Sequence, residues 1–399
     1  MRLSCLLLIR DLLLVSAFSL FYKSSAAFSL LRPPGPTILR AGHNLRSDPQ
    51  QLDQRRRTGV VRWNVWSNPQ AVEDYQNLLN GIVDEVTTDQ ASLIVVGDGY
   101  RGLANCLQTI NPRGNDVVVE VGPDLVIPEI FPGDDGDEDD VGTNFPVYLC
   151  VAAEELAGII DKCPAEKKDD LVFLSDGFLE PVLKTRGCCG KTQTQAVLWL
   201  TFNQYGVAYD GRTSMGDNAN GLAEWAGEST ATGKWAGALT ERLGYGDLFC
   251  RVMFYRDWRR WMLEKVVYGA VVNIVGALHP KSDGKPSTHA DVANYFSEEV
   301  EQMVDELGYT LRGYMAVTLL SGSSGRICAV AEANGRDVPC EVTPASFALY
   351  NKLFWDNSML ARDRGFPDTC SMHTEYVEYG IEKKNIDPEV IVEKKKKYY

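Results

Sequence analysis

The sequence has few of the residues that form metal centres and nucleic-acid-binding surfaces. It contains four histidines in 399 residues, and its ten cysteines form no C-x-x-C pair, so we expect no metal site built from these ligands. The acidic stretch 133–142 lacks the spacing of an EF-hand loop and is expected to be a solvated loop. With 40 lysines and arginines against 54 aspartates and glutamates, the formal net charge is −14, and we expect no nucleic-acid partner.

Two enzyme motifs and a bilayer-length apolar run are also missing. The sequence has neither G-x-S-x-G nor G-x-x-x-x-G-K-[ST], so nothing in it indicates a serine hydrolase or a P-loop protein. A membrane-spanning helix needs about 20 apolar residues. Arg10 and Asp11 interrupt the apolar N-terminus, and the apolar run 266–278 has 13 residues. We therefore expect no stable membrane insertion after processing.

The first 57 residues have the composition of a targeting presequence. A positive end at Arg2, an apolar core over 12–21 and small residues over 24–27 are typical of a signal peptide. The next stretch, 29–57, is rich in arginine and proline and poor in acids, as in a transit peptide. With Phe28 directly after two alanines, this order resembles the two-part presequences of complex plastids and predicts the plastid stroma. A secretory signal followed by a disordered linker is the alternative.

Residues 91–120 combine the parts of a dinucleotide-binding unit. A short β-branched run, 93–96, predicts a buried parallel strand. It leads into GDGYRG at 97–102, a G-x-G-x-x-G turn, and a helix is expected over 103–110. The next strand, 116–120, ends in a glutamate 18 positions beyond the last glycine, close to the spacing of about 20 in Rossmann folds.

The residues of this unit have separate expected roles toward NAD or NADP. Gly97 permits the tight turn, Gly99 leaves room for the pyrophosphate, and Gly102 allows the helix to pack close to the strand. The helix end presents N–H groups and a positive dipole to the phosphates. Glu120 would accept hydrogen bonds from a ribose 2′-hydroxyl and repel a 2′-phosphate, which favours NAD. A plain glycine turn is the alternative, and the carboxylate of Asp98 fits that alternative better.

Short apolar strands alternate with helices in the first half of the chain, which predicts an α/β fold with a doubly wound parallel sheet. Further strands are expected at 60–66, 147–151, 171–174 and 194–202, and helices at 71–86, 154–163, 230–243, 257–279, 288–306, 313–335 and 343–360, with a loop over 211–233. The domains predicted are a presequence (1–57), a Rossmann-type domain (58–254), an all-α domain (255–380) and a charged tail (381–399).

One face of the long helix expected at 257–279 has the composition of a pocket wall. Lys265, Gly269 and Asn273 recur at every fourth residue, so they share one narrow face. Lys265 and Asn273 are about 12 Å apart along the axis, enough for a small substrate. A lysine beside a carbonyl can polarise its oxygen and stabilise the alkoxide that hydride transfer forms, and Asn273 would hold a hydroxyl or carboxylate. The alternative is a lysine that reaches solvent and an asparagine that caps a buried carbonyl.

Three stretches resemble ketopantoate reductase relatives, in a plant and algal branch of unknown substrate. They are DLVFLSDGFLEP (170–181), TATGKWA (230–236) and LEKVVYGAVVNIVGALH (263–279). The resemblance implies a Rossmann domain, a helical domain like that of 6-phosphogluconate dehydrogenase, and NADP as the usual cofactor. It matches Lys265 to the family's catalytic lysine and Asn273 to its second substrate asparagine. We expect a small-molecule substrate, and a homodimer formed through the helical domain.

The match departs from the family pattern at several positions. Gly269 replaces the first substrate asparagine, and Asp176 replaces the loop asparagine near the nicotinamide, where it is a cofactor-binding candidate. Ser358 resembles the family's late serine, but the glutamate that follows in the family is missing. We therefore predict an NAD(P)-dependent oxidoreductase of a small 2-keto or 2-hydroxy acid, with ketopantoate itself disfavoured. A catalytically inactive, dinucleotide-binding plastid sensor or assembly protein is the alternative.

Overall fold

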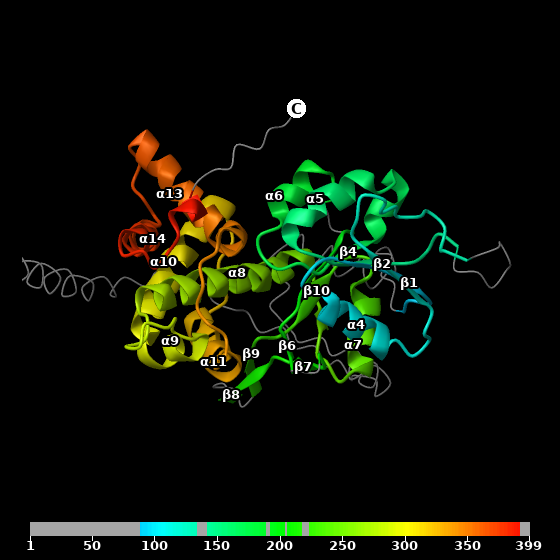
Figure 1. Ribbon diagram of the computed structural model, residues 1–399, viewed down its shortest axis with the longest axis horizontal. Helices are drawn as coiled ribbons and strands as arrows, with labels where there is room; N and C mark the ends of the chain where they lie inside the picture. The colour runs from blue at the N-terminus through cyan, green and yellow to red at the C-terminus, as the bar shows by residue number, and fades with distance from the viewer. Residues whose placement is uncertain (1–87, 134–141, 189–191, 204–205, 218–222, 392–399) are drawn as a thin grey trace, which may run out of the picture. The chain divides into compact units, whose positions relative to one another are not determined.

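The structure, a computed structural model, describes residues 88–133, 142–188, 192–203, 206–217 and 223–391 (Figure 1). The predicted presequence, the strand expected at 60–66 and the helix expected at 71–86 lie outside the described residues. The sheet and the helical region belong to one unit of the chain, residues 65–399. The division into two domains at residue 254 stays a prediction.

A seven-stranded sheet is built from the first half of the described chain, in the order β2-β1-β3-β4-β5-β10-β11. Its strands are β1 (Ser92–Val96), β2 (Asp116–Glu120), β3 (Val147–Cys150), β4 (Leu171–Phe173), β5 (Thr194–Val197), β10 (Thr230–Thr232) and β11 (Arg251–Val252). The strands from β2 to β5 run parallel, whereas β10 is antiparallel to β5 and parallel to β11. Because β2 and β3 lie on opposite sides of β1, the topological switch point falls between β1 and β3.

Helices cover both faces of the sheet, so the predicted doubly wound α/β fold is confirmed (Figure 1). These helices are α4 (Arg101–Ile110), α5 (Ala153–Lys162), η3 (Ala165–Asp170), α6 (Glu180–Thr185) and α7 (Ala236–Tyr245). Ile94 and Val96 of β1 pack in the core beneath α4 and α7, and Leu93 and Val95 pack in the core beneath α5 and α6. Successive strand residues point to opposite faces, so a strand that is apolar at every position must be covered on both sides.

From α8 onward the described chain is mainly helical, as predicted. The helices are α8 (Tyr255–Leu278), α9 (His289–Tyr295), α10 (Ser297–Met315), α11 (Ser323–Asn334), α12 (Pro344–Ser346), the π-helical turn η4 (Phe347–Asn351), α13 (Lys352–Arg364), α14 (Ser371–Glu382) and η5 (Pro388–Ile391). By length and composition α8 could cross a membrane, but 72% of its apolar window is buried inside the protein. Its apolar side chains form the core of the helical region.

Three predictions in the sheet region are wrong. The strand expected at 194–202 is divided into β5 and β6 (Leu200–Phe202), which pairs with β7 (Ala208–Asp210) in a separate sheet. The loop expected at 211–233 contains β8 (Thr213–Asp217), β9 (Ala223–Ala226) and β10, and the helix expected from 230 begins with α7. Strands β8 and β9 are short, and their stability comes from pairing with each other and from contact with α11, which periodicity does not reveal.

The helical boundaries differ where the backbone leaves helical geometry. The helix expected at 288–306 is two helices that meet at Phe296. The one expected at 313–335 is interrupted after α10 by Ala316, whose φ is 54°, and resumes with α11. The one expected at 343–360 contains the π-helical turn η4, and α14 was not predicted.

Two of the stretches that carry the resemblance, 170–181 and 230–236, meet in a buried ion-pair network. Asp170, just before β4, accepts hydrogen bonds from Lys234 Nζ at 2.6 Å and Trp235 Nε1 at 2.9 Å. Its other carboxylate oxygen accepts one from Lys167 Nζ at 2.9 Å, and the Asp170 and Lys167 side chains are 7% and 2% exposed. The network ties η3 to the turn before α7, so these shared residues stabilise the fold.

Candidate functional site

The glycine turn after β1 leaves open backbone at the carboxyl edge of the sheet. Gly99 has a φ of +82°, and no described atom beyond its two chain neighbours lies within 4 Å of where a Cβ would stand. Helix α4 begins just beyond, with no side-chain cap at Tyr100 and no acidic residue in its first turn. Its first N–H groups therefore have no side-chain partner and can meet an anion. This geometry fits the pyrophosphate of a dinucleotide.

The other two glycines of the motif have neighbours that the sequence did not indicate. A Cβ on Gly97 would lie 2.2 Å from Glu155 Oε2, and that carboxylate accepts the Ala152 N–H at 3.0 Å. Gly97 thus allows the loop after β3 to approach. A Cβ on Gly102 would meet the ring of Phe202 at 3.6 Å, an ordinary contact. The atoms nearest to that Cβ belong to Phe202 of β6, and the role of Gly102 in bringing α4 close to β1 stays a prediction.

Carboxylates gather near Tyr100 at the start of α4. Burial, together with the charges of Asp176, Glu154 and Glu155, raises the pKa of Tyr100 to about 12. These carboxylates disfavour a phosphate beside the Tyr100 hydroxyl, because like charges repel. The open backbone at Gly99 is therefore the better position for a pyrophosphate.

Glu120 ends β2 next to the glycine turn, as the Rossmann pattern predicts. Its register partner on β1 is Val96, the residue before the turn. The exposed Glu120 carboxylate accepts a hydrogen bond from Arg101 Nη2 at 2.7 Å. A ribose hydroxyl could bind Glu120, whereas a 2′-phosphate would be attracted to Arg101 and repelled by Glu120.

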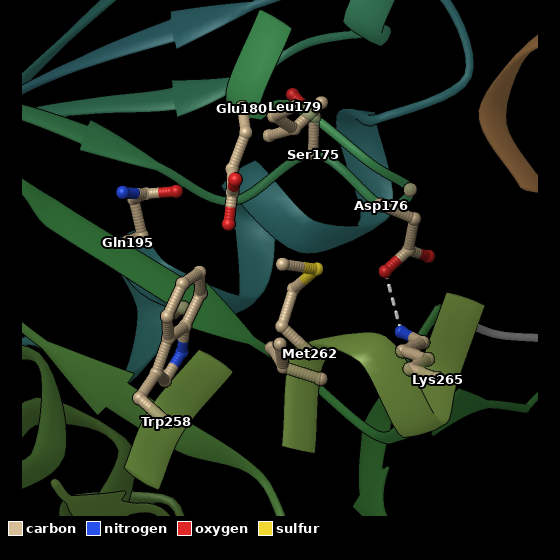
Figure 2. A pocket seen from close by; sticks show the side chains of 11 residues that line it. Ser175, Asp176, Leu179, Glu180, Gln195, Trp258, Met262 and Lys265 are labelled. Carbon is tan, nitrogen blue, oxygen red and sulfur yellow. Dashed lines mark hydrogen bonds and ion pairs between the residues drawn. The ribbon is translucent and has the colours of Figure 1, made fainter. Parts of the chain in front are cut away.

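Lys265 lies at the carboxyl edge of the sheet, beside the loop after β4 (Figure 2). Its Nζ donates to the Asp176 carboxylate and, at 2.6 Å, to the Leu198 carbonyl, and it lies 5.0 Å from the centroid of a Trp199 ring. The Lys265 side chain is 14% exposed and that of Asp176 39%. Leu198 follows β5 directly, and its carbonyl faces Lys265 because the expected long strand breaks there. The structure thus brings two predicted site residues together as an ion pair.

A narrow pocket that is open to solvent lies beside this ion pair, between the loop after β4, strand β5 and the first half of α8. Glu180, Gln195, Trp258 and Met262 line it together with Lys265 (Figure 2). Its position at the carboxyl ends of parallel strands is where α/β proteins bind small molecules.

Asn273 does not line this pocket. Its Nδ2 donates to the Gly269 carbonyl at 2.8 Å, and its Oδ1 accepts the Glu341 N–H at 3.1 Å and lies 3.3 Å from His289 Nε2. These bonds correspond to the alternative expectation, in which Asn273 satisfies backbone groups. Contact between Asn273 and a substrate stays a prediction, and it would require some of these bonds to be exchanged.

Tyr350 packs on the face of α8 between Lys265 and Asn273. A Cβ on Gly269 would lie 2.6 Å from the Tyr350 ring. The turn that carries Tyr350, η4, also accepts a backbone hydrogen bond from the loop after β4. The prediction of an open pocket wall along this face is therefore wrong at Gly269, because a small residue there admits an aromatic ring from a distant segment.

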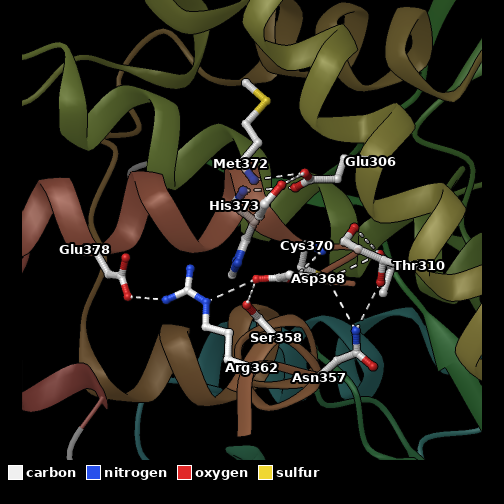
Figure 3. Close-up of polar contacts among 12 residues, drawn as sticks. Glu306, Thr310, Asn357, Ser358, Arg362, Asp368, Cys370, Met372, His373 and Glu378 are labelled. Carbon is white, nitrogen blue, oxygen red and sulfur yellow. Dashed lines mark hydrogen bonds and ion pairs between the residues drawn. The ribbon is translucent and has the colours of Figure 1, made fainter. Parts of the chain in front are cut away.

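Ser358 lies in a separate polar network of the helical region (Figure 3). Its side chain is buried, and its hydroxyl donates to Asp368. The same carboxylate accepts from Arg362 Nε at 3.2 Å and from the Cys370 N–H at 2.9 Å. The network joins α13 to the start of α14, so this serine has a structural role here.

Sequence reasoning missed four residues at or near the pocket: Glu180, Gln195, Trp258 and Tyr350. One signal was present, since Gln195 is a polar side chain in the middle of a buried strand, and buried polar groups need partners. The other three come together through loop and helix packing that no local pattern encodes.

No protein-family model matches the sequence, and no curated protein matches it. Three similar solved structures are a D-mandelate dehydrogenase with NADH, a PanE/ApbA family ketopantoate reductase from Ralstonia eutropha JMP134 and a 2-dehydropantoate 2-reductase from Methylococcus capsulatus. Each is 12% identical, with TM-scores of 0.40, 0.43 and 0.39. The matches cover 73%, 73% and 75% of this chain and 99%, 99% and 93% of theirs.

Proposed function

We propose that the protein is an NAD(P)-dependent oxidoreductase that transfers hydride to or from a small 2-keto or 2-hydroxy acid. The observation that carries the proposal is the position of Lys265, a largely buried ammonium group beside a pocket at the carboxyl edge of the sheet. The open glycine turn lies at the same edge, beside the switch point where dinucleotides bind in such sheets.

Some residues at this edge of the sheet would contact the cofactor, and others would contact the substrate. Gly99 and the first turn of α4 would hold the pyrophosphate, with Glu120 at the ribose. Bound NAD(P)H supplies the hydride. An ammonium group has three N–H donors, and Lys265 uses two of them on Asp176 and Leu198.

Among the described residues the third donor of Lys265 has no acceptor, which leaves it for a substrate oxygen. It would orient the carbonyl and supply the proton as negative charge develops on that oxygen. Asp176 holds the amine in place for this step. Its role in the proposal is therefore to position Lys265.

A second function, dinucleotide binding without turnover, is favoured by the ring of Tyr350. It fills the face at Gly269, where the resemblance places a substrate asparagine. A plastid sensor or assembly protein would need the glycine turn and no open substrate face.

The variant Lys265→Ala separates the two functions. Wild type and variant are titrated with NADH and NADPH by fluorescence and assayed with a panel of 2-keto acids. We expect cofactor affinity to be retained and kcat/KM to fall by about 10²–10⁴-fold, the range for loss of a general acid. Lys285→Ala, which removes an exposed lysine in the loop after α8, is the matched control.

Each result decides between the functions. Unchanged turnover in Lys265→Ala would refute the role of Lys265. Tight cofactor binding by wild type with no oxidation across the panel favours the second function, and failure to bind either cofactor refutes both. Tighter binding of NADH than NADPH agrees with Glu120, and the reverse agrees with the family resemblance.

The cellular location and the oligomeric state remain part of the proposal. A fluorescent protein fused behind residues 1–57 should enter the plastid stroma, and entry into the secretory pathway would contradict this. Light scattering of the processed protein should give the mass of a dimer.

A further inference from the structure

The pocket beside Lys265 contains two buried N–H donors without a partner among the described residues. They are Gln195 Nε2 and Trp258 Nε1. The two residues are 3% and 2% exposed, and both line this one pocket. A buried donor without an acceptor costs free energy, so such groups in native proteins nearly always have a partner. Two of them in one pocket indicate that a ligand supplies the acceptor.

The charges around the pocket cancel in pairs. Glu180 accepts two hydrogen bonds from Arg259, one of them from Nη2 at 2.8 Å. At the other end, Lys265 is paired with Asp176. Neither end presents an uncompensated charge, so the pocket suits a neutral group better than a second carboxylate.

Glu180 adds acceptor capacity to the same end of the pocket. A carboxylate has about four lone-pair sites, and two of those on Glu180 are used by Arg259. In Figure 2 the Glu180 carboxylate, the Gln195 amide and the Trp258 ring surround one side of the pocket, with the amide oxygen of Gln195 toward Glu180. A half-turn of the amide group would direct Nε2 to that side instead. That side therefore offers both donors and acceptors.

The spacing along α8 sets the length of the ligand. Trp258 and Lys265 are seven residues apart, about 10 Å along the helix axis. Met262 lies between them and makes the middle of the wall apolar. A ligand that reaches both ends has polar groups at its two ends and an apolar middle.

We propose that this pocket binds a neutral carboxamide-type group at the far end of a ligand whose reacting carbonyl contacts Lys265. The carboxamide oxygen accepts hydrogen bonds from the Gln195 and Trp258 side, and its N–H donates to Glu180. The reacting carbonyl rests on the proposed function, whereas the carboxamide end does not. The carboxamide belongs either to the substrate or to the nicotinamide end of the cofactor, which carries the same chemistry.

The variant Gln195→Met tests the proposal, because it removes the donor with little change in volume. Calorimetry measures the binding of three 2-keto acids of equal length that end in a carboxamide, a carboxylate or a methyl group. We expect wild type to bind the carboxamide about tenfold more tightly than the methyl compound, and Gln195→Met to lose this preference; tenfold corresponds to about 1.4 kcal/mol. Gln108→Met, at an exposed position on α4, is the matched control.

The source of the carboxamide is decided by a second titration, with NADPH and with 2′-phospho-ADP-ribose, which lacks the nicotinamide. If Gln195→Met weakens NADPH binding alone, the group belongs to the cofactor. If it leaves both unchanged and weakens the carboxamide keto acid, the group belongs to the substrate.

Two results overturn the proposal. In the first, wild type binds the carboxamide and methyl compounds equally well, and Gln195→Met binds NADPH as tightly as wild type does. This result would mean that water satisfies the two donors. The other is tightest binding of the dicarboxylate. If Gln195→Met fails to fold, the same titrations are made with Trp258→Phe, which removes the other donor. Thermal unfolding of each variant shows whether it is folded. These are binding measurements, so the carboxamide preference can stand even if Lys265→Ala shows that the oxidoreductase proposal is wrong.

Discussion

Replacing Gly269 by alanine should destabilise the protein, although alanine normally stabilises a helix. Gly269 lies in the middle of α8, where alanine gains about 1 kcal/mol over glycine from helix propensity. The added Cβ would lie 2.6 Å from the ring of Tyr350. Carbon atoms pack at about 3.5–4.0 Å, so the ring would have to retreat by about 1 Å.

The size of the effect follows from these two opposing terms. Adding a methyl group to a packed site costs about 1–3 kcal/mol. After subtraction of the propensity gain of about 1 kcal/mol, Gly269→Ala should lower the free energy of unfolding by up to about 2 kcal/mol. For a chain of this size that corresponds to a fall in Tm of several degrees, roughly 2–4 °C per kcal/mol.

A matched glycine controls for helix propensity. Gly158 lies in the middle of α5, is exposed, and has nothing within 4 Å of a Cβ built on it. Gly158→Ala should therefore raise the free energy of unfolding by about 0.5–1 kcal/mol. Urea denaturation followed by circular dichroism gives both values on the same scale.

The double variant isolates the contact with Tyr350. In a Tyr350→Ala background the ring is absent, so Gly269→Ala should recover the stabilisation seen at Gly158. If Gly269→Ala stabilises the wild-type protein as much as Gly158→Ala does, Tyr350 does not pack on α8, and the face between Lys265 and Asn273 is open to a substrate.

Two further predictions concern buried charge. Asp170→Asn leaves the buried Lys167 ammonium without its carboxylate and should lower the free energy of unfolding, measured by urea denaturation, by about 3–5 kcal/mol. The matched control is Asp169→Asn at the exposed neighbouring position, which should lower it by under about 0.5 kcal/mol. Equal values for the two variants would contradict the network. Burial lowers the pKa of His289 to about 4 and of His373 to about 3, so the unfolded chain takes up protons first as the pH falls below 6.5. Stability should therefore drop between pH 6.5 and 4, by about 2 kcal/mol per histidine at pH 5, and a urea midpoint that stays constant over this range would refute it.

The parallel strands of the sheet could be predicted because their local pattern carries enough information. Residues 93–96 are apolar at every position, and this occurs where a strand is covered on both faces. The glycine turn and the acidic residue at the end of β2 could also be predicted, since their spacing is set by one strand, one helix and the next strand. The short strands β8 and β9 escaped prediction because pairing with each other and contact with α11, which lies far along the chain, stabilise them.

The candidate site was predictable only in its separate parts. Lys265 and Asp176 were each identified from the sequence, but their ion pair and the Leu198 carbonyl beside the amine depend on how α8 packs against the sheet. The small residue Gly269 suggested an open wall, yet a glycine gives equal room to a ligand and to a side chain of the protein. The structure placed Tyr350 there.

By itself, the sequence determined the parallel strands β1 to β5, the glycine turn and the position of one lysine on an apolar helix, because each depends on residues close together in the chain. Tertiary structure alone decided what surrounds that lysine. Glu180, Gln195 and Trp258 come from three separate segments that packing of α8 against the sheet brings to one pocket, and the turn η4 places Tyr350 on α8 nearby.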